Sequence, residues 1–276
     1  MNLKKIYPKR HNWAHKGQFG RVLIMAGSKR YSGSPIFNAV SALKSGADLI
    51  TIVGHRRAMD IAAAYLPDII TFSLDDELKI KHLPQIINLA KDFDSVIIGC
   101  GLSRSKETYR AIREIIRKIG LPMIIDAEAI RAVAEETRLL KNKAVVITPH
   151  AEEFRILTGE TVKPDVDDRK EKVIQWAKKL KTVILLKGYV DVISDGNHVV
   201  INKSGSPFMT KGGFGDTLSG IGGALLARGI KPFLAGQTAA YINGRAGELA
   251  SKKFGEAVLA SDIFEFIPEV IKDHKY

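Results

Sequence analysis

The chain has 276 residues, 45% of them hydrophobic, which is enough for one large folded domain or two small ones. Its formal net charge of +12 suggests an anionic partner, but the charges are dispersed and aromatic residues make up only 7%, which disfavours a nucleic-acid platform and is compatible with anionic small molecules. The sequence contains no apolar run of membrane-spanning length and no secretory signal, and its single cysteine, Cys100, excludes an internal disulfide and fits a reducing cytoplasm.

Six short apolar runs, rich in β-branched residues and ended by Gly, Pro or Asp, are predicted to be buried strands. They cover residues 21–27, 49–54, 95–99, 122–126, 144–149 and 182–188. Helical periodicity appears between them, at residues 34–47, 106–120 and 167–180. The stretch VDVISDGNHVVI (190–201) places DGN between two β-branched runs and predicts a hairpin, and helices are expected at 216–228, 233–253 and 261–271.

Continuous apolar strands that alternate with helices are typical of a mainly parallel sheet covered by helices on both faces. We therefore expect an α/β fold. No repeat, low-complexity tract or linker interrupts the pattern, so residues 1–276 are predicted to form a single domain. In such sheets ligands gather beyond the carboxyl ends of the strands. Polar or glycine-rich clusters follow five of the predicted strands, which predicts one shared cleft at that edge.

These clusters match neither of two common nucleotide-binding motifs. GSKRYSG (27–33) has the wrong spacing for a GxxxxGK[ST] phosphate loop and no lysine after its second glycine. GCGLSR (99–104) lacks the third glycine of a GxGxxG dinucleotide fingerprint. A P-loop ATPase and a hydride-transferring Rossmann enzyme are therefore disfavoured.

A glycine-rich turn, MTKGGFGDTLSG (209–220), runs into a predicted helix that Gly229 can cap. The backbone N–H groups of residues 212–215 can point at one anion and, with the helix dipole, form an anion hole. Asp216 at the junction has two interpretations. It can cap the helix, or it can be a general base that the helix dipole keeps ionised and that accepts the proton of a substrate hydroxyl. The local pattern supports both.

This turn also resembles a family signature. GSPFMTKGGFGDTLSGIGGALLARG (205–229) is similar to GNPGMATGGTGDVLTGIIAALLAQG of the NAD(P)H-hydrate dehydratases, which belong to the ribokinase-like superfamily. Other motifs of the family are matched in the same order over most of the chain. They are KGQFGRVLIMAGSKRYSGSP (16–35), KSGADLITIV (44–53), IIGCGLSR (97–104), IIDAEAI (124–130), ITPHAEEFRILTG (147–159), ILLKGYVDVI (184–193), INGRAGELA (242–250) and ASDI (260–263).

The resemblance implies a ribokinase-like three-layer α/β/α sandwich with a mainly parallel central sheet. It also implies a lyase that repairs hydrated NADH or NADPH: a nucleotide phosphorylates the C6 hydroxyl of the hydrated ring, and phosphate is then eliminated. ADP, giving AMP, is the expected phosphoryl donor, with ATP as the other candidate and Mg²⁺ as the cofactor. A cytoplasmic homotetramer without the epimerase domain often fused upstream is expected, and neither nucleic acid nor membrane is an expected partner.

The resemblance also implies roles for individual residues. Asp216 is the catalytic base. The hydrated dinucleotide is expected at Ser34, Gly101, His150 and Asp216. The nucleotide is expected at Lys187, Gly188, Asp191, Lys211, Gly212, Gly213 and Gly215. Glu153 matches a position linked to Mg²⁺ and phosphate.

Several of these positions have simpler structural interpretations. His150 could cap a helix at a strand end, and Glu153 could be a favourable first-turn charge. Lys187 could be a solvated lysine at a strand end. Ser34, followed by proline, could merely begin a helix. Asp126 is predicted to cap the helix at residues 127–136, and Cys100 is expected to be buried and inert.

The chain departs from the family signature near the expected phosphates. Asp191 replaces a usual threonine and could repel phosphate, whereas Lys211 replaces a usual threonine or alanine and could offset this by adding a cation. Phe214 replaces serine or threonine, Cys100 replaces proline, and Ser34 replaces alanine. These changes leave the expected fold and phosphoryl chemistry in place, and they leave the exact substrate and nucleotide open.

Two other functions compete with the dehydratase. One is a ribokinase-like kinase of a small alcohol of the hydroxyethylthiazole or hydroxymethylpyrimidine type, which shares the GxGD turn. The other is a non-catalytic nucleotide- or nucleic-acid-binding protein, which the net charge of +12 motivates.

Overall fold

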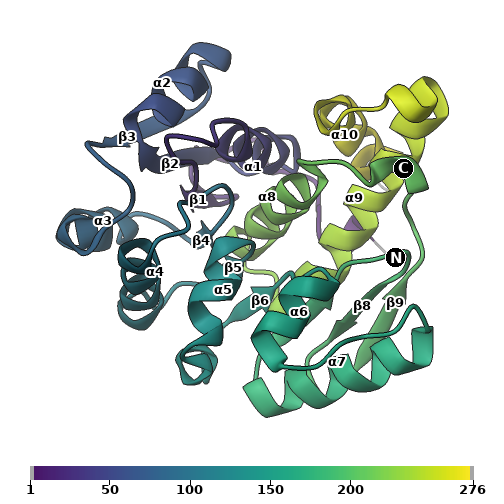
Figure 1. Cartoon of the computed structure of the whole chain (residues 1–276). Coiled ribbons are helices and arrows are strands. Elements are labelled where there is room, and N and C mark those ends of the chain that lie inside the picture. The colour runs from purple at the N-terminus through teal and green to yellow at the C-terminus, as the bar shows by residue number, and fades with distance from the viewer. Residues whose placement is uncertain (1–2, 274–276) are drawn as a thin grey trace.

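The computed structural model describes residues 3–273 and places nine strands in one sheet, in the order β3-β2-β1-β4-β5-β6-β7-β8-β9 (Figure 1). The strands are β1 (Arg21–Met25), β2 (Leu49–His55), β3 (Ile70–Leu74), β4 (Ser95–Ile98), β5 (Met123–Ile125), β6 (Val145–Ile147), β7 (Val183–Leu186), β8 (Asp191–Ser194) and β9 (Val199–Asn202). Strands β1 to β7 pair parallel with one another, whereas β8 pairs antiparallel with both β7 and β9. The predicted strands and the hairpin are thereby confirmed.

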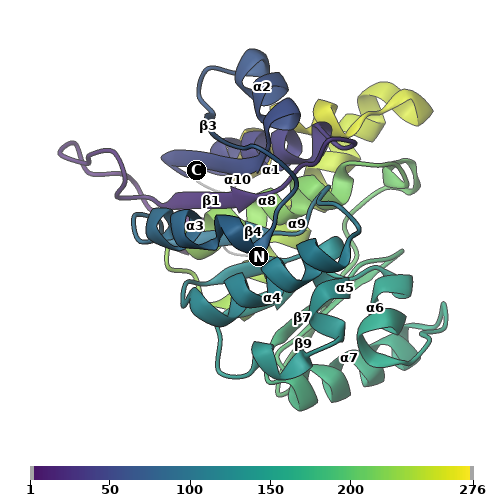
Figure 2. The ribbon, with the colours of Figure 1, turned by 60° about the vertical axis from the view of Figure 1, so that its left-hand side comes forward.

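Helices cover both faces of the sheet. They are α1 (Gly33–Lys44), α2 (Arg56–Tyr65), α3 (Leu83–Ala90), α4 (Lys106–Lys118), α5 (Glu128–Ala134), α6 (Ala151–Thr158), α7 (Val166–Leu180), α8 (Phe214–Ala227), α9 (Pro232–Phe254) and α10 (Ile263–Asp273). Buried side chains of α1, α2, α8, α9 and α10 form one core, and those of α3 to α7 form the other. Figure 2 shows the two layers on opposite sides of β1 and β4.

Successive side chains along a strand point alternately into these two cores, as the pleat of a strand requires. In β1, Val22 and Ile24 face the first core, while Leu23 and Met25 face the second. All four side chains are completely buried. This explains why the strands read as continuous apolar runs, and it confirms the expected three-layer α/β/α sandwich with a mainly parallel sheet.

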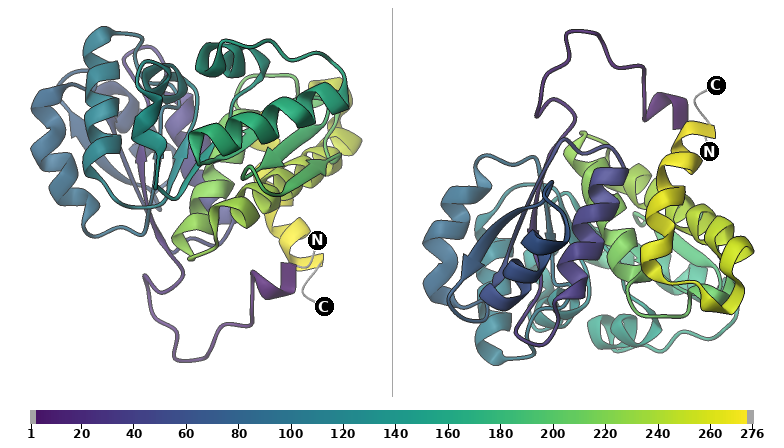
Figure 3. Two further views of the ribbon diagram at one scale, coloured as in Figure 1. Left: turned by 90° about the horizontal axis from the view of Figure 1, so that it is seen from below. Right: turned by 90° about the horizontal axis from the view of Figure 1, so that it is seen from above.

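The N-terminal segment leaves this sandwich and returns to it. Figure 3 shows it as an extended purple loop that ends in a short 3₁₀ helix beside α10. Leu3, Ile6 and Tyr7 are buried in the same core as α10, which fixes the start of the described chain. None of the helices within residues 3–273 is both long and apolar enough to cross a membrane.

Strand β3 and helices α2 and α3 were not predicted. β3 lies at the edge of the sheet, and Ile70 at its start is 51% exposed. An edge strand is buried on fewer sides than a central one, so its sequence, ITFSL, lacks the long apolar run that marks the others.

Helices α1 and α8 approach each other closely at Gly220. A Cβ at Gly220 in α8 would lie 2.0 Å from Oγ of Ser41 and 2.3 Å from the carbonyl oxygen of Asn38, both in α1. Only glycine therefore allows the two helices to pack at this distance.

We predict that Gly220→Ala destabilises the protein by about 3 kcal/mol, because the added methyl group would overlap backbone atoms that cannot rotate away. Chemical denaturation measures this free energy of unfolding. Gly120→Ala is the control, since a Cβ there meets no atom within 4 Å. Equal stability of the two variants would contradict the close packing of α1 and α8.

Candidate active site

A buried ion pair lies at the centre of the cluster beyond the carboxyl ends of the strands. Lys187 follows β7 and Asp126 follows β5, and Lys187 Nζ lies 3.0 Å from Asp126 Oδ1. Ser219 of α8 donates its hydroxyl proton to the other oxygen of Asp126, Oδ2, at 2.8 Å. The simpler interpretation of Lys187 as a solvated lysine is therefore wrong, because the side chain turns inward to a carboxylate that is 3% exposed.

The two partners of this pair stabilise each other's charge. Burial alone would raise the pKa of Asp126, but the ammonium of Lys187 and the hydrogen bonds to the carboxylate hold it below its ordinary value. Burial likewise opposes the charge of Lys187, and Asp126 and Glu153 overcome that effect and raise its pKa. Both groups are charged at neutral pH.

The backbone around Asp126 is shaped to aim this carboxylate inward. Ala127, not Asp126, occupies the N-cap position of α5, with φ of 49° and ψ of −120°, and no side chain caps the helix there. The predicted capping role of Asp126 is therefore wrong. Gly99, with φ of 125°, permits the approach, because a Cβ there would lie 1.8 Å from the carbonyl oxygen of Asp126. Such strained geometry often occurs at functional sites.

His150 and Glu153 form a capping box at the start of α6. His150 Nδ1 accepts from the backbone N–H groups of Glu152 and Glu153, each at 3.2 Å, and Glu153 Oε2 accepts from the backbone N–H of His150 at 2.9 Å. The simpler interpretation of His150 as a helix cap is therefore confirmed. Half of its side chain is still exposed, so the ring can also contact a ligand.

Glu153 also belongs to the charge cluster. Its Oε2 lies 3.8 Å from Lys187 Nζ. Burial raises the pKa of Glu153, and Lys187 partly opposes that rise. One ammonium thus lies beside two carboxylates, and it is closer to Asp126.

The glycine turn begins its helix earlier than predicted. α8 begins at Phe214, and its N-cap is Gly213 with φ of 100°. Asp216 is therefore the third residue of the helix, and the interpretation that it caps the helix is wrong. The first N–H groups of a helix have no partner within it, so those at this end remain available to an anion.

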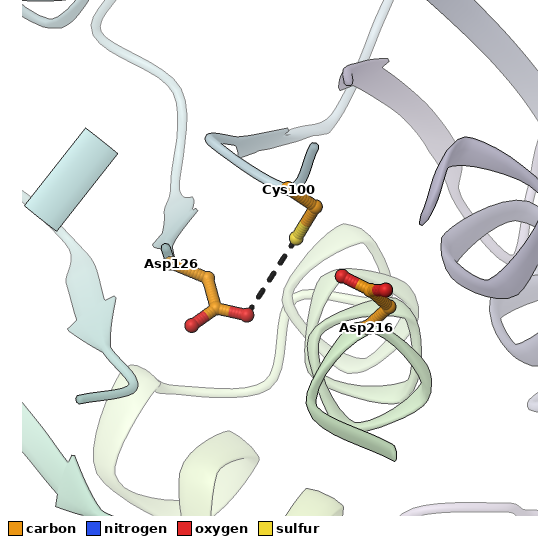
Figure 4. Close-up of side chains that lie close together, drawn as sticks. All are labelled: Cys100, Asp126 and Asp216. Atoms are coloured by element: carbon orange, nitrogen blue, oxygen red, sulfur yellow. Dashed lines mark hydrogen bonds between the residues drawn. The ribbon is translucent and has the colours of Figure 1, made fainter. Parts of the chain in front are cut away.

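Asp216 is partly buried and faces Cys100 and Asp126 (Figure 4). Burial and the neighbouring negative charge of Asp126 raise its pKa to about 6, against hydrogen bonds from Ser34 and Cys100 that lower it. The pKa of Asp216 therefore lies above its ordinary value of 3.8. A carboxylate with a pKa near 6 is a stronger base than an ordinary aspartate and is still ionised at pH 7 to 8.

Two of the expected nucleotide residues, Gly215 and Gly188, lie close to Lys187 and its partners. A Cβ at Gly215 would lie 3.4 Å from Lys187 Nζ and 3.9 Å from Asp126 Oδ2. The start of α8 and the ammonium therefore border the same space. At Gly188, a Cβ would lie 2.5 Å from the guanidinium of Arg169, which donates to the carbonyl oxygen of Lys187 at 2.9 Å.

Asp191 and Lys211, the two departures beside the expected phosphates, both have protein partners. Asp191 accepts from the backbone N–H of Gly188 at 3.2 Å and from the amide of Asn202 at 3.0 Å. Its carboxylate thus holds the turn after β7. Lys211 Nζ donates to the carbonyl oxygens of Glu256 and, at 2.9 Å, Val258. The structure therefore gives Lys211 a different contact from the expected one, tying the glycine turn to the chain after α9.

Two of the expected substrate residues lie together. A Cβ at Gly101 would lie 2.9 Å from both Cβ and Oγ of Ser34, and the φ of Gly101 is 64°. The structure also brings Ser34 to Asp216, whose carboxylate accepts its hydroxyl proton. His150 is linked to the ion pair through Glu153.

Mg²⁺ fits one part of this cluster better than another. Cys100, Asp126 and Asp216 bring three ligand-type atoms within 4.8 Å of one another. A thiol is a poor partner for Mg²⁺, which prefers oxygen, and both oxygens of Asp126 already accept hydrogen bonds. Glu153 fits better, because Mg²⁺ commonly uses one or two carboxylates together with substrate phosphates.

Sequence reasoning missed four residues of the site. Asp126 was taken as a helix cap and Cys100 as inert, while Asn38 and Arg169 were not considered. The signal for Asp126 was its place in a polar cluster at a strand end. Asn38 and Arg169 carry no such signal, because each acts from within a helix on a backbone atom: Asn38 donates to the carbonyl oxygen of Asp216 at 2.7 Å.

Comparison with known proteins assigns this arrangement to a family. A family model described as NAD(P)H-hydrate dehydratase matches residues 22–269. The bifunctional NAD(P)H-hydrate repair enzyme Nnr of Pyrobaculum aerophilum is 41% identical over 264 residues, covering 95% of this chain and 52% of that protein. The ADP-dependent (S)-NAD(P)H-hydrate dehydratase of Cenarchaeum symbiosum is 36% identical over 273 residues, covering 98% of this chain and 95% of that protein. The chain thus spans about half the length of the bifunctional relatives it matches.

Solved structures agree with these matches. The ADP/ATP-dependent NAD(P)H-hydrate dehydratase from Bacillus subtilis, co-crystallised with ATP/Mg²⁺, superposes with a TM-score of 0.84 and 26% identity, covering 99% of this chain and 96% of that one. A hydroxyethylthiazole kinase from Pyrococcus horikoshii has a TM-score of 0.66 and 17% identity, covering 97% of this chain and 91% of that one. The kinase shares the fold, whereas the dehydratase shares more of both fold and sequence.

We predict that Asp216→Asn stabilises the protein above pH 7. A raised pKa means that the folded state resists ionisation, so wild type loses stability as the pH rises from the ordinary aspartate value of 3.8 through about 6. The amide carries no charge and avoids this loss, for a gain of roughly 1–3 kcal/mol at pH 8 that vanishes near pH 4.

Thermal or chemical unfolding between pH 4 and 8 measures this difference. Asp167→Asn is the matched control, because Asp167 is also a first-turn aspartate, in α7, and its side chain is 91% exposed. Parallel pH profiles for wild type and Asp216→Asn would contradict the raised pKa.

Proposed function

Because the chain belongs to the NAD(P)H-hydrate dehydratase family, we propose that it restores hydrated NADH and NADPH to their reduced forms at the expense of ADP. In this reaction the hydrated dinucleotide and ADP give the reduced dinucleotide, AMP and phosphate. The observation that carries the proposal is the placement of Asp216: a carboxylate with a raised pKa in the first turn of α8, beside the anion-binding turn and near Lys187.

Asp216 is the general base of the first step. Its carboxylate accepts the proton of the C6 hydroxyl while that oxygen attacks the terminal phosphoryl group of ADP and AMP leaves. The lone pair of the ring nitrogen then expels phosphate from C6, and loss of a ring proton restores the dihydropyridine. Hydroxide is a poor leaving group and phosphate a good one, which explains phosphoryl transfer in a dehydratase.

The glycine turn and Lys187 stabilise the transferring phosphoryl group. The N–H groups of residues 212–215 supply hydrogen-bond donors fixed by the start of α8, and Lys187 adds a positive charge that Asp126 keeps in place. Gly188 and Gly215 leave room for phosphate oxygens, since a side chain at either position would meet Arg169 or Lys187. Asp191 and Lys211 shape the loops on either side through their backbone contacts.

Mg²⁺ is the proposed cofactor. It would bind between the nucleotide phosphates and Glu153, and when bound it would neutralise phosphate charge. The carboxylate of Glu153 is held for this task by the backbone N–H of His150. Ser34, Gly101 and His150 are the proposed contacts of the hydrated dinucleotide.

A kinase of a small alcohol is the second candidate, because it needs the same base and the same anion-binding turn. The higher identity and TM-score to the dehydratase favour the first candidate. Residues 1–276 are proposed to act as a single domain and to form a cytoplasmic homotetramer. Neither nucleic acid nor membrane is a proposed partner, because the positive charges are dispersed along the chain.

We predict that the protein, mixed with hydrated NADH or NADPH, Mg²⁺ and ADP, restores the near-ultraviolet absorbance of the dihydropyridine ring. AMP and phosphate should form in equal amounts, because one phosphoryl transfer precedes each elimination. ATP in place of ADP tests the donor, and hydroxyethylthiazole with ATP tests the kinase. Failure to restore absorbance with either nucleotide would rule out the dehydratase.

We also predict that Asp216→Asn lowers kcat by roughly 10²-fold or more, because the amide cannot accept the proton. In wild type, kcat/KM should fall below about pH 6 as Asp216 becomes protonated. Steady-state kinetics from pH 5 to 8 measure both effects. The control is again Asp167→Asn, which should retain the wild-type profile. Activity of Asp216→Asn within a few-fold of wild type would remove Asp216 from its role.

A further inference from the structure

The thiol of Cys100 lies between the two carboxylates of the site. Figure 4 shows its side chain pointing from the loop after β4 into the space between Asp126 and Asp216. Sγ donates to Asp126 Oδ2 at 3.6 Å, and Sγ lies within 4.8 Å of one carboxylate oxygen of Asp126 and one of Asp216. Cys100 is completely buried, so its proton has few acceptors to choose from.

Asn38 fixes the sulfur from the opposite side. Its amide Nδ2 donates to Cys100 Sγ at 3.5 Å and to the carbonyl oxygen of Asp216 at 2.7 Å. Because the amide uses the sulfur as an acceptor, the S–H bond remains free to point at the carboxylates. Asn38 is itself completely buried, which anchors both contacts to α1.

Lys187 compensates the negative charge of Asp126 more strongly than that of Asp216, so a further hydrogen-bond donor between the two carboxylates would stabilise both. Its Nζ is 3.0 Å from Asp126, whereas its effect on Asp216 is a weaker charge interaction. The charged or titratable groups that face Asp216 are Cys100 from the loop after β4, Asp126 from the end of β5 and Lys187 from the end of β7. From α1 it is met by the hydroxyl of Ser34 and the amide of Asn38, which do not titrate.

The thiol is a feature of this chain rather than of the signature that it resembles. That signature has proline at the position of Cys100, and proline offers neither a side-chain donor nor a backbone N–H. The phosphoryl chemistry therefore does not require the thiol, which leaves it free to adjust the base.

We propose that Cys100 is a positioning residue whose single thiol proton bridges the carboxylates of Asp126 and Asp216 and favours the ionised form of Asp216. The effect on catalysis rests on the proposed function, in which Asp216 is the general base. The bridge itself is a property of the resting protein, so it can be tested without substrate.

The S–H stretching band in the infrared spectrum tests the bridge directly. Cys100 is the only cysteine of the chain, so the band belongs to one thiol. We expect it at the lower frequency of a thiol bonded to a carboxylate, shifting between pH 5 and 7.5 as Asp216 ionises. Asp216→Asn should abolish this shift, and Asp126→Asn should raise the frequency. A band at the frequency of an unbonded thiol, unchanged by pH, would overturn the proposal even if the variants fail to fold.

The pH profile of turnover tests the consequence. Cys100→Ala removes the donor. The acid limb, which is the fall of kcat/KM at low pH, should then move to higher pH by about half a unit, since a weak hydrogen bond is worth roughly 0.5–1 kcal/mol. Cys100→Ser restores a donor and should return the limb to the wild-type position or below. A purely packing role predicts lower stability in both variants and no movement of the limb.

The two measurements separate failure of this proposal from failure of the proposed function. A band that responds to Asp126→Asn and to the ionisation of Asp216 supports the bridge, even in a protein that does not turn over hydrated dinucleotides. The opposite result is also possible: the protein has full dehydratase activity, and Cys100→Ala does not move the acid limb of its kcat/KM profile. That result would overturn the inference and leave the proposed function intact.

Discussion

The ion pair between Lys187 and Asp126 is the contact on which the rest of the site depends. Its two members follow strands β7 and β5, which lie on either side of β6, so the pair spans the carboxyl edge of the sheet. Breaking a buried pair by removing one partner leaves an uncompensated charge, which is costly. The pair therefore fixes the position of the ammonium, and the glycine turn is built around that position: Gly215 leaves it the space.

One ammonium close to several carboxylates also explains how the groups divide their roles. Asp126 takes the nearest contact, and its pKa falls. Glu153 and Asp216 are more weakly compensated, so burial raises their pKa values. Groups of one chemical type are thus separated into a fixed anion, a candidate contact for Mg²⁺ and a base that accepts protons near neutral pH. Environments that push apart the pKa values of neighbouring acids are a common way to assign such roles.

Much of the fold could be predicted because buried parallel strands produce long apolar runs. The six predicted central strands and the hairpin were found within a few residues of their expected bounds, whereas β3 at the sheet edge carries no such signal. The site was harder. The pattern placed Asp216 and Lys187 at the right edge of the sheet, but it could not show that α8 begins at Phe214 or that Lys187 turns inward. The contacts of Lys211 could not be predicted for a related reason: its partners are carbonyl oxygens distant in sequence, and a backbone acceptor leaves no trace in composition.

The central claim is that burial beside Asp126 gives Asp216 the pKa of a base. Carboxyl carbon NMR of the wild-type protein, with Asp216 assigned by comparison with Asp216→Asn, measures this pKa directly. The structure predicts a midpoint near pH 6 for Asp216. The pKa of Asp126 should lie below the ordinary aspartate value. An Asp216 that titrates near its ordinary value of 3.8 would contradict the account, because burial and Asp126 would then not raise its pKa.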